Sequence, residues 1–130
     1  DCIVCAVMDA RCSQVYNALF EIKNGVVTRL CDDRALSLDD LKNELLSVDG
    51  RIIIAGDGTD ITCKYIGNEI KNAESAPVNL KYQRASSTAL VAFEMINNGQ
   101  TVSAQKLMPV YLRLPQAQRE LNKKLGGRTK

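Results

Sequence analysis

The sequence predicts an α/β domain in which a three-stranded meander precedes a helix, a buried strand and two further helices. Up to about residue 31, apolar side chains either run continuously or alternate with polar ones, which is typical of strands. Beyond residue 37 they recur every three to four positions, as in helices, except in one short apolar run. The expected order is therefore β-β-β-α-β-α-α, with a mixed sheet and helices packed on it.

The meander is expected to contain three strands. Residues 3–8 (IVCAVM) are apolar throughout, which suits a strand covered on both faces. Residues 14–22 alternate in polarity, so that one side faces the core. The side chains that we expect on the core side are Tyr16, Ala18, Phe20 and Ile22. KNG at 23–25 predicts a tight hairpin, because Asn and Gly tolerate positive φ, and the third strand covers 26–31.

A helix and a buried strand follow the meander. Ser37 and Asp40 have the spacing of a capping box at the start of the helix. Its apolar stripe consists of Leu38, Leu41, Leu45 and Val48. Gly50 ends this segment. Residues 51–56 (RIIIAG) then form a strand that we expect to lie parallel to the first.

Two more helices are expected in the second half of the chain. The first covers about 59–72. Its inner residues are expected to be Ile61, Tyr65, Ile66 and Ile70. After a linker at 77–83, the second helix covers 84–99. Its buried residues are expected to be Ala89, Leu90, Ala92, Phe93 and Ile96. An extended piece, PVYLR at 109–113, leads to a final amphipathic segment.

Composition and charge narrow the class of protein. With 130 residues, 45% hydrophobic and 25% charged, the chain is expected to form one globular domain. Residues 113–130 carry six basic side chains against one acid, so they form a basic tail. Such a tail is either a solvated, flexible helix end or a contact for nucleic acid or an acidic partner. Asp1 stands where a signal peptide has a basic flank, and no apolar run is long enough for a membrane span. We expect a cytoplasmic protein.

The chain has no histidine and five cysteines. Without histidine, it cannot form a Ser-His-Asp or Cys-His pair, and a zinc site would lack its usual nitrogen ligand. Cys2 and Cys5 form a C-x-x-C motif, but on a strand residues three apart point to opposite faces, so we expect buried, reduced thiols. The sequence therefore predicts no catalytic residue, metal site or cofactor.

The predicted element order is that of the half-module of ribonuclease-H-like and actin-like folds. Four stretches resemble the second half of the TsaB (YeaZ) family, in the glycoprotease-like branch of the actin/Hsp70-type ATPase superfamily. They are VMDARCSQVYNALFE (7–21), AGDGTD (55–60), RASSTALVAFEMINNG (84–99) and LMPVYLR (107–113). The resemblance covers about residues 3–120 and lacks the family's N-terminal half. It implies that residues 1–130 are a single domain, the C-terminal half of a longer two-domain parent.

The resemblance implies a non-catalytic scaffold subunit. TsaB-like proteins join a TsaD-like catalytic paralogue and a TsaE-like ATPase, and together these install the threonylcarbamoyl group on an adenosine of tRNA beside the anticodon. Contact with tRNA would be indirect, and no membrane is involved. A second hypothesis is a residual nucleotide- or metal-binding hydrolase, or a glycoprotease-like peptidase domain, that uses Asp9 and Asp57. A third is an actin-like interaction domain unconnected with tRNA.

The turn at 9–13 lies where active members of the superfamily wrap a phosphate, and its candidate residues are Asp9 and Arg11. Phosphate loops rely on glycine so that backbone N–H groups can approach the anion. Ala10 and Arg11 carry Cβ atoms that hinder this approach, and Asp9 would repel a phosphate unless magnesium lay between them. We favour a degenerate loop in which Asp9 accepts backbone amides of its own turn and Arg11 is exposed.

Two other segments are candidate sites. The turn formed by Gly56, Asp57 and Gly58 lies where a nucleotide-binding relative contacts adenosine, but a simple helix cap by Asp57 is the favoured interpretation. The residues Tyr111, Leu112 and Arg113 are candidates for contact with a partner or with tRNA. An alternative of equal weight is that this segment covers the edge of the sheet. Because a domain taken from its neighbour exposes apolar surface, a homodimer is also expected.

Overall fold

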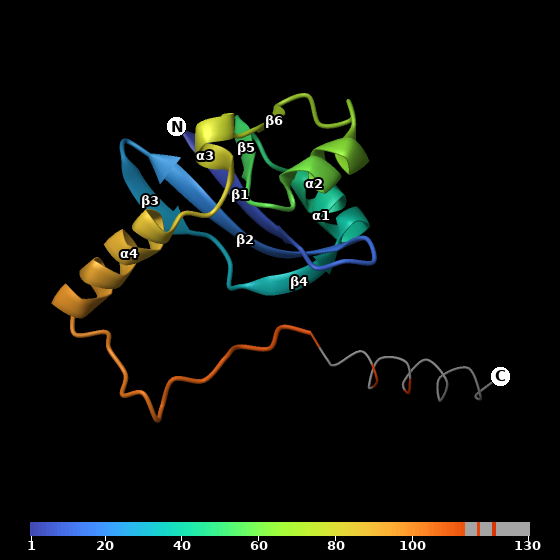
Figure 1. Ribbon diagram of the computed structural model, residues 1–130. Coiled ribbons are helices and arrows are strands. Elements are labelled where there is room, and N and C mark those ends of the chain that lie inside the picture. Colours follow the sequence, from blue (N-terminus) through green and yellow to red (C-terminus); the bar gives the residue numbers. More distant parts are fainter. Residues whose placement is uncertain (114–116, 118–120, 122–130) are drawn as a thin grey trace.

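The computed structural model describes residues 1–113, 117 and 121 of the chain (Figure 1). Its strands are β1 (Cys2–Asp9), β2 (Gln14–Lys23), β3 (Val26–Arg29), β4 (Arg34–Ser37), β5 (Ile52–Ala55) and β6 (Ala73–Ser75). Its helices are α1 (Leu38–Leu45), α2 (Thr59–Ile66), α3 (Val78–Lys81) and α4 (Ala85–Asn97). Within this described part, none of the helices combines the length and the apolar character that crossing a bilayer demands.

All six strands belong to one mixed sheet with the order β3-β2-β1-β5-β6, and β4 pairs with the opposite end of β2 from β3. β1 is antiparallel to β2 and parallel to β5, and β6 is parallel to β5. The predicted mixed sheet and the parallel pairing of residues 51–56 with the first strand are confirmed. Asn24 and Gly25 both have positive φ, so the predicted hairpin is confirmed as well.

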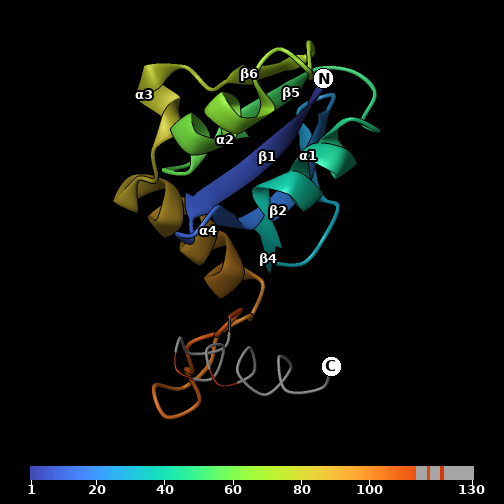
Figure 2. The ribbon, with the colours of Figure 1, turned by 90° about the vertical axis from the view of Figure 1, so that its right-hand side faces the viewer.

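Helices α1 and α2 pack on the same face of this sheet, which we call the covered face (Figures 1 and 2). The core lies between these two helices and the sheet. Its buried residues are Cys5, Val7, Val15, Leu19, Leu38, Leu41, Leu45, Ile52, Ile54, Ile66 and Ile70. The predicted capping box is present, because the Asp40 amide donates to the Ser37 hydroxyl over 3.0 Å. The predicted stripe of α1 is buried at Leu38, Leu41 and Leu45.

The prediction of which side of β2 faces the core is wrong. Val15 and Leu19 on the other side are 0% and 4% exposed, whereas Tyr16 and Phe20 are only half-buried. Alternation along a strand identifies two sides but not the side on which the later helices will pack. Here both helices pack over the side of Val15. The side of Tyr16 and Phe20 belongs to the second face of the sheet, which we call the open face.

The predicted burial of α4 is also wrong. Every residue of α4 is exposed, and Leu90 and Phe93 reach 72% and 65% exposure. The helix projects away from the sheet instead of lying on it (Figure 1). The 3.6-residue period correctly identified a helix, but it contains no information about the surface on which that helix packs.

Other differences concern short elements. β4 and β6 were not predicted, because three- and four-residue strands next to helices leave almost no alternating pattern. The helix predicted over 59–72 ends at Ile66, since Gly67 has a φ of +54°. Within it Tyr65 is 41% exposed, although Ile66 is buried as expected. The expected linker at 77–83 contains α3. The final amphipathic segment and most of the basic tail lie outside the described residues.

Candidate functional site

The candidate residues of two separate sequence segments meet at one edge of the sheet. Asp9 is the last residue of β1, and Gly56 and Asp57 come directly after β5, which is parallel to β1. In open α/β sheets, ligands bind beyond the carboxyl ends of such neighbouring parallel strands. The position predicted from the sequence is therefore one where ligands bind in other open α/β sheets. Whether a phosphate could bind here depends on which backbone amides are free to donate to it.

The carboxylate of Asp9 is held within its own turn. Its Oδ1 accepts the backbone amide of Arg11 over 2.7 Å, and its Oδ2 lies 3.0 Å from the guanidinium Nη1 of Arg11. The Arg11 side chain is 85% exposed. These contacts match the degenerate loop that the sequence predicts in place of a phosphate site.

The backbone amides of this turn already have acceptors in the protein. The Asp9 amide donates to Oδ1 of Asp57 over 3.2 Å, and the Ala10 amide donates to the Gln14 carbonyl over 3.0 Å. With the amide of Arg11 bound to Asp9, three successive N–H groups point at protein oxygens. A phosphate-binding turn needs such groups directed at the anion. The Asp57 carboxylate therefore occupies a donor that a phosphate would use.

The rest of the turn adopts a backbone conformation that is rare for residues with side chains. Arg11, Cys12 and Ser13 have φ angles of 62°, 55° and 56°. Residues other than glycine populate this left-handed region only a few per cent of the time. Three successive Cβ atoms there make the turn a compact loop of side chains rather than an open cradle of amides.

The glycines after β5 are required by close packing against β1. Gly56 has a φ of +115°, and a Cβ atom there would collide with the Val7 carbonyl oxygen. A Cβ atom on Gly58 would lie 3.1 Å from the Asp9 amide nitrogen. Gly58 is the N-cap of α2, so the favoured interpretation of Asp57 as the helix cap is wrong. Its carboxylate instead joins this loop to the Asp9 turn.

The third candidate segment reaches the same region from the end of the described chain. A guanidinium Nη1 of Arg113 donates to the carbonyl of Ala10, in the turn after β1. Its Nε is buried, and the described structure contains no acceptor for it. Leu112 is partly buried, whereas Tyr111 is 84% exposed. All three predicted sites are therefore neighbours, although about 100 residues separate the first from the last.

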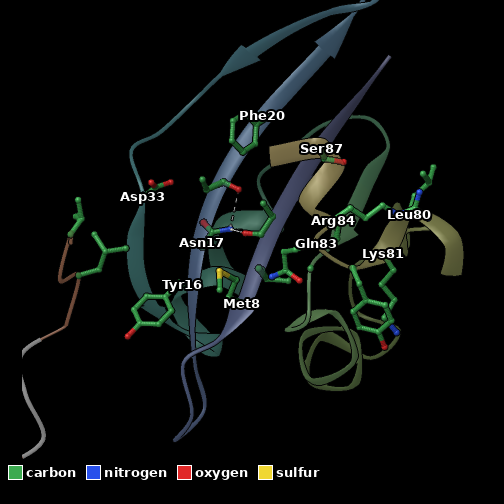
Figure 3. Close-up of a pocket in the computed structure, with 18 of the residues that line it drawn as sticks. Met8, Tyr16, Asn17, Phe20, Asp33, Leu80, Lys81, Gln83, Arg84 and Ser87 are labelled. Carbon is green, nitrogen blue, oxygen red and sulfur yellow. Dashed lines mark hydrogen bonds between the residues drawn. The ribbon is translucent and has the colours of Figure 1, made fainter. Parts of the chain in front are cut away.

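A cavity of about 600 Å³ opens on the open face beside these residues (Figure 3). Its floor is formed by apolar residues of β1, β2 and β5. These are Ala6, Met8, Tyr16, Ala18, Phe20 and Ala55. Its opposite wall comes from α3 and the start of α4, with Leu80, Lys81 and Arg84 labelled in Figure 3, and the segment 110–113 closes a third side. The volume is within the range of about 300–1,000 Å³ that is usual for ligand pockets.

Two cations at this cavity lack an acidic partner among the residues described. Lys81 lies 2.6 Å from Asp60, and this hydrogen bond raises the pKa of Lys81. Asp33, on the other side, is paired with Arg29 over 2.8 Å. The remaining charged groups, the guanidinium groups of Arg84 and Arg113, contact backbone carbonyls only. The cavity therefore combines an apolar floor with unbalanced positive charge.

Sequence reasoning missed this cavity for two reasons. Tyr16 and Phe20 were placed in the core, and Lys81 and Arg84 carry no motif that could single them out.

Across the described ranges, no group of three or more Cys, Asp or Glu side chains is arranged to hold a metal ion. Asp9 and Asp57 are the only pair of carboxylates at the sheet edge that the sequence proposed as ligands, and each already has a protein donor.

Two solved structures from Pseudomonas aeruginosa are similar to this chain. One is YeaZ, with 19% identity and a TM-score of 0.57, and the other is an uncharacterized protein with similarity to peptidase YeaZ, with 19% identity and a TM-score of 0.58. Each match covers 85% of this chain but 49% of the other, so this chain spans about half the length of the structures it matches. No family model and no curated protein matches the sequence. The likeness confirms the predicted actin-like, ribonuclease-H-like fold class.

Proposed function

We propose that this chain is a domain of a TsaB-like scaffold subunit, without catalytic activity, in the machinery that makes threonylcarbamoyladenosine in tRNA. The fold shared with YeaZ supports a TsaB-like protein. The proposed partners are a TsaD-like catalytic paralogue and a TsaE-like ATPase. In this proposal the chain contacts tRNA only indirectly, and the protein acts in the cytoplasm. That the chain is the C-terminal half of a two-domain parent remains a prediction.

The observation that carries the non-catalytic part of this proposal is the closed turn after β1. The amides of Asp9, Ala10 and Arg11 all donate to protein oxygens. A residual hydrolase acting through Asp9 and Asp57 would need these carboxylates free to hold a metal ion. Each of them instead accepts a backbone N–H, and Asp9 also pairs with Arg11. These contacts favour the scaffold over the hydrolase.

The partner side of the proposal is tested by capture of a purified TsaD-like protein on the immobilised chain. Tyr111 is the best probe of the predicted contact segment, because at 84% exposure its removal leaves the fold intact. We expect Tyr111→Ala to weaken capture by about tenfold, the loss of one exposed aromatic anchor. A matched control is Tyr65→Ala on α2, over the covered face.

The proposal predicts that the Tyr65→Ala chain captures the TsaD-like protein as the wild type does. Failure of the wild-type chain to retain the partner at any tested concentration would contradict it. Equal losses for the two tyrosine variants would show that the weakened capture is not specific to the 111–113 segment, which would contradict its proposed role.

A further inference from the structure

The segment that follows α4 returns to the body of the domain at its end. Every residue from 82 to 111 is exposed, whereas Leu112 and Arg113 are partly buried. The backbone hydrogen bonds that the structure shows for residues 98–107 stay within this segment or join it to the end of α4. Among the described residues, the one hydrogen bond that joins the segment to the strands and their turns runs from Arg113 to the carbonyl of Ala10. This guanidinium is therefore the point at which the segment is tied to the sheet.

The peptide group between Ala10 and Arg11 is a well-fixed acceptor for this guanidinium. On its N–H side, the Arg11 amide donates to Oδ1 of Asp9 over 2.7 Å. On its carbonyl side, it accepts from Arg113. Hydrogen bonds in such a chain polarise one another, and here a carboxylate stands at one end and a guanidinium at the other. Ala10 is only 8% exposed, so water competes little for this carbonyl.

Tyr111 lies between this attachment and a stiff residue. Pro109 has a fixed φ, and its ring also restricts the residue before it to extended conformations. Tyr111 comes midway between Pro109 and Arg113 in the sequence. Its side chain is 84% exposed, so the ring is accessible to another molecule although the backbone is restrained on both sides.

We propose that Arg113 is a positioning residue, whose hydrogen bond to the Ala10 carbonyl holds residues 109–112 against the turn after β1 and so fixes where Tyr111 is presented. The predicted contact with a partner then belongs to Tyr111, while Arg113 acts within the chain. A side chain that is held in place beforehand binds more tightly, because less conformational freedom is lost on association. The attachment itself stands apart from the proposed function, whereas its benefit to partner capture rests on that function.

Removing the Arg113 guanidinium should leave the rest of the fold intact. The chain would lose one charge-assisted hydrogen bond, but the buried Nε, which has no acceptor among the residues described, would be removed as well. These two changes act on stability in opposite directions. The closed turn keeps its own hydrogen bonds from the amides of Asp9, Ala10 and Arg11. The effect of Arg113→Met is therefore expected at residues 109–112.

The first test needs no partner and measures backbone order parameters of the isotope-labelled chain by nitrogen relaxation. We expect the Tyr111 amide to have an order parameter of about 0.8 in the wild type, close to that of rigid backbone, and of less than about 0.6 in Arg113→Met. Lys106→Met removes an exposed cation from the same segment and is the matched control, which should leave Tyr111 as ordered as in the wild type. Equal order at Tyr111 in the wild type and in Arg113→Met would overturn the proposal.

The second test is a double-mutant cycle on capture of a TsaD-like protein. Arg113→Met should weaken capture by about threefold to tenfold, and the double variant should be no weaker than Tyr111→Ala alone. A residue that acts through Tyr111 has no effect once Tyr111 is gone, whereas direct contact of Arg113 with the partner would make the two losses add. Additive losses, or undiminished capture by Arg113→Met, would contradict the positioning role. If the wild-type chain captures no partner, the proposed function fails, and the order parameters alone decide the role of Arg113.

Discussion

The two faces of the single sheet differ in what they contribute. On the covered face, Leu41 and Leu45 of α1 and Ile54 of β5 are completely buried. On the open face, made by the same strands, Met8 is half-exposed and a cavity remains. Alternate residues of one strand therefore serve separate purposes, so that stability rests on one face while the other is available for binding.

Truncating one buried and one half-exposed side chain should separate the two faces directly. Leu41→Ala should lower the free energy of unfolding by about 3 kcal/mol, because it removes a fully buried side chain and leaves a cavity. Met8→Ala on the open face should lower it by less than about 1 kcal/mol. Urea unfolding of both variants measures the difference. Equal losses would mean that the open face is covered in solution in a way that the structure does not show.

A polar network on the covered face should have the next largest effect. Asn17, only 3% exposed, accepts from Arg34 over 3.0 and 3.1 Å, and Arg34 also lies 2.7 Å from Glu44. Arg34→Met leaves the Asn17 oxygen without a donor and should lower the free energy of unfolding by about 2 kcal/mol.

The control for this network is a surface ion pair. Arg51 and Glu74 are both more than half exposed, so Arg51→Met should lower the free energy of unfolding by no more than about 0.5 kcal/mol. Similar unfolding curves for the Arg34 and Arg51 variants would show that burial does not strengthen the network.

Alkaline pH should probe the covered face through Cys5. Burial raises the pKa of the Cys5 thiol from its ordinary 9.0 to about 12. Below pH 9.0 the thiol is neutral in both states, so its contribution to stability is constant. Above it the unfolded thiol ionises first, and stability falls until the pH passes the folded value. At pH 10 the free energy of unfolding should be about 1 kcal/mol lower for this reason.

The measurement is the pH dependence of unfolding for the wild type and for Cys5→Ala. The variant should lack this part of the alkaline decline, so that the two pH profiles diverge above pH 9.0. Parallel profiles would show that the Cys5 thiol is reached by water in the folded state.

A substitution in the closed turn should change stability only slightly. Cys12 is exposed and has a φ of 55°, so Cys12→Gly should stabilise the fold by up to about 1 kcal/mol by relieving the left-handed backbone. The same change in a strand, Thr28→Gly in β3, should destabilise by a similar amount. Thermal unfolding measures both. A destabilised Cys12→Gly would mean that the Cys12 side chain contributes more than the backbone strain removes.

The sequence predicted those features that are local. Ser37 and Asp40 are three residues apart, and the stripe of α1 repeats within one helix, so both were correct. Features set by distant segments were not predictable. Which side of β2 is buried depends on where α1 and α2 pack, and the role of Asp57 depends on the Asp9 amide, 48 residues earlier. Whether the apolar residues of α4 are buried depends on the surfaces that other segments offer to the helix, and periodicity does not encode those surfaces.

The turn after β1 is closed to phosphate because its amides donate to the Asp9 and Asp57 carboxylates and to the Gln14 carbonyl. The most direct test of this closure is a titration of the isotope-labelled chain with ATP and magnesium, followed through the amide resonances of Asp9, Ala10 and Arg11. Because these amides donate to protein oxygens, we predict that their signals stay unchanged up to millimolar nucleotide. Saturable shifts of these three signals would show instead that the turn binds the nucleotide.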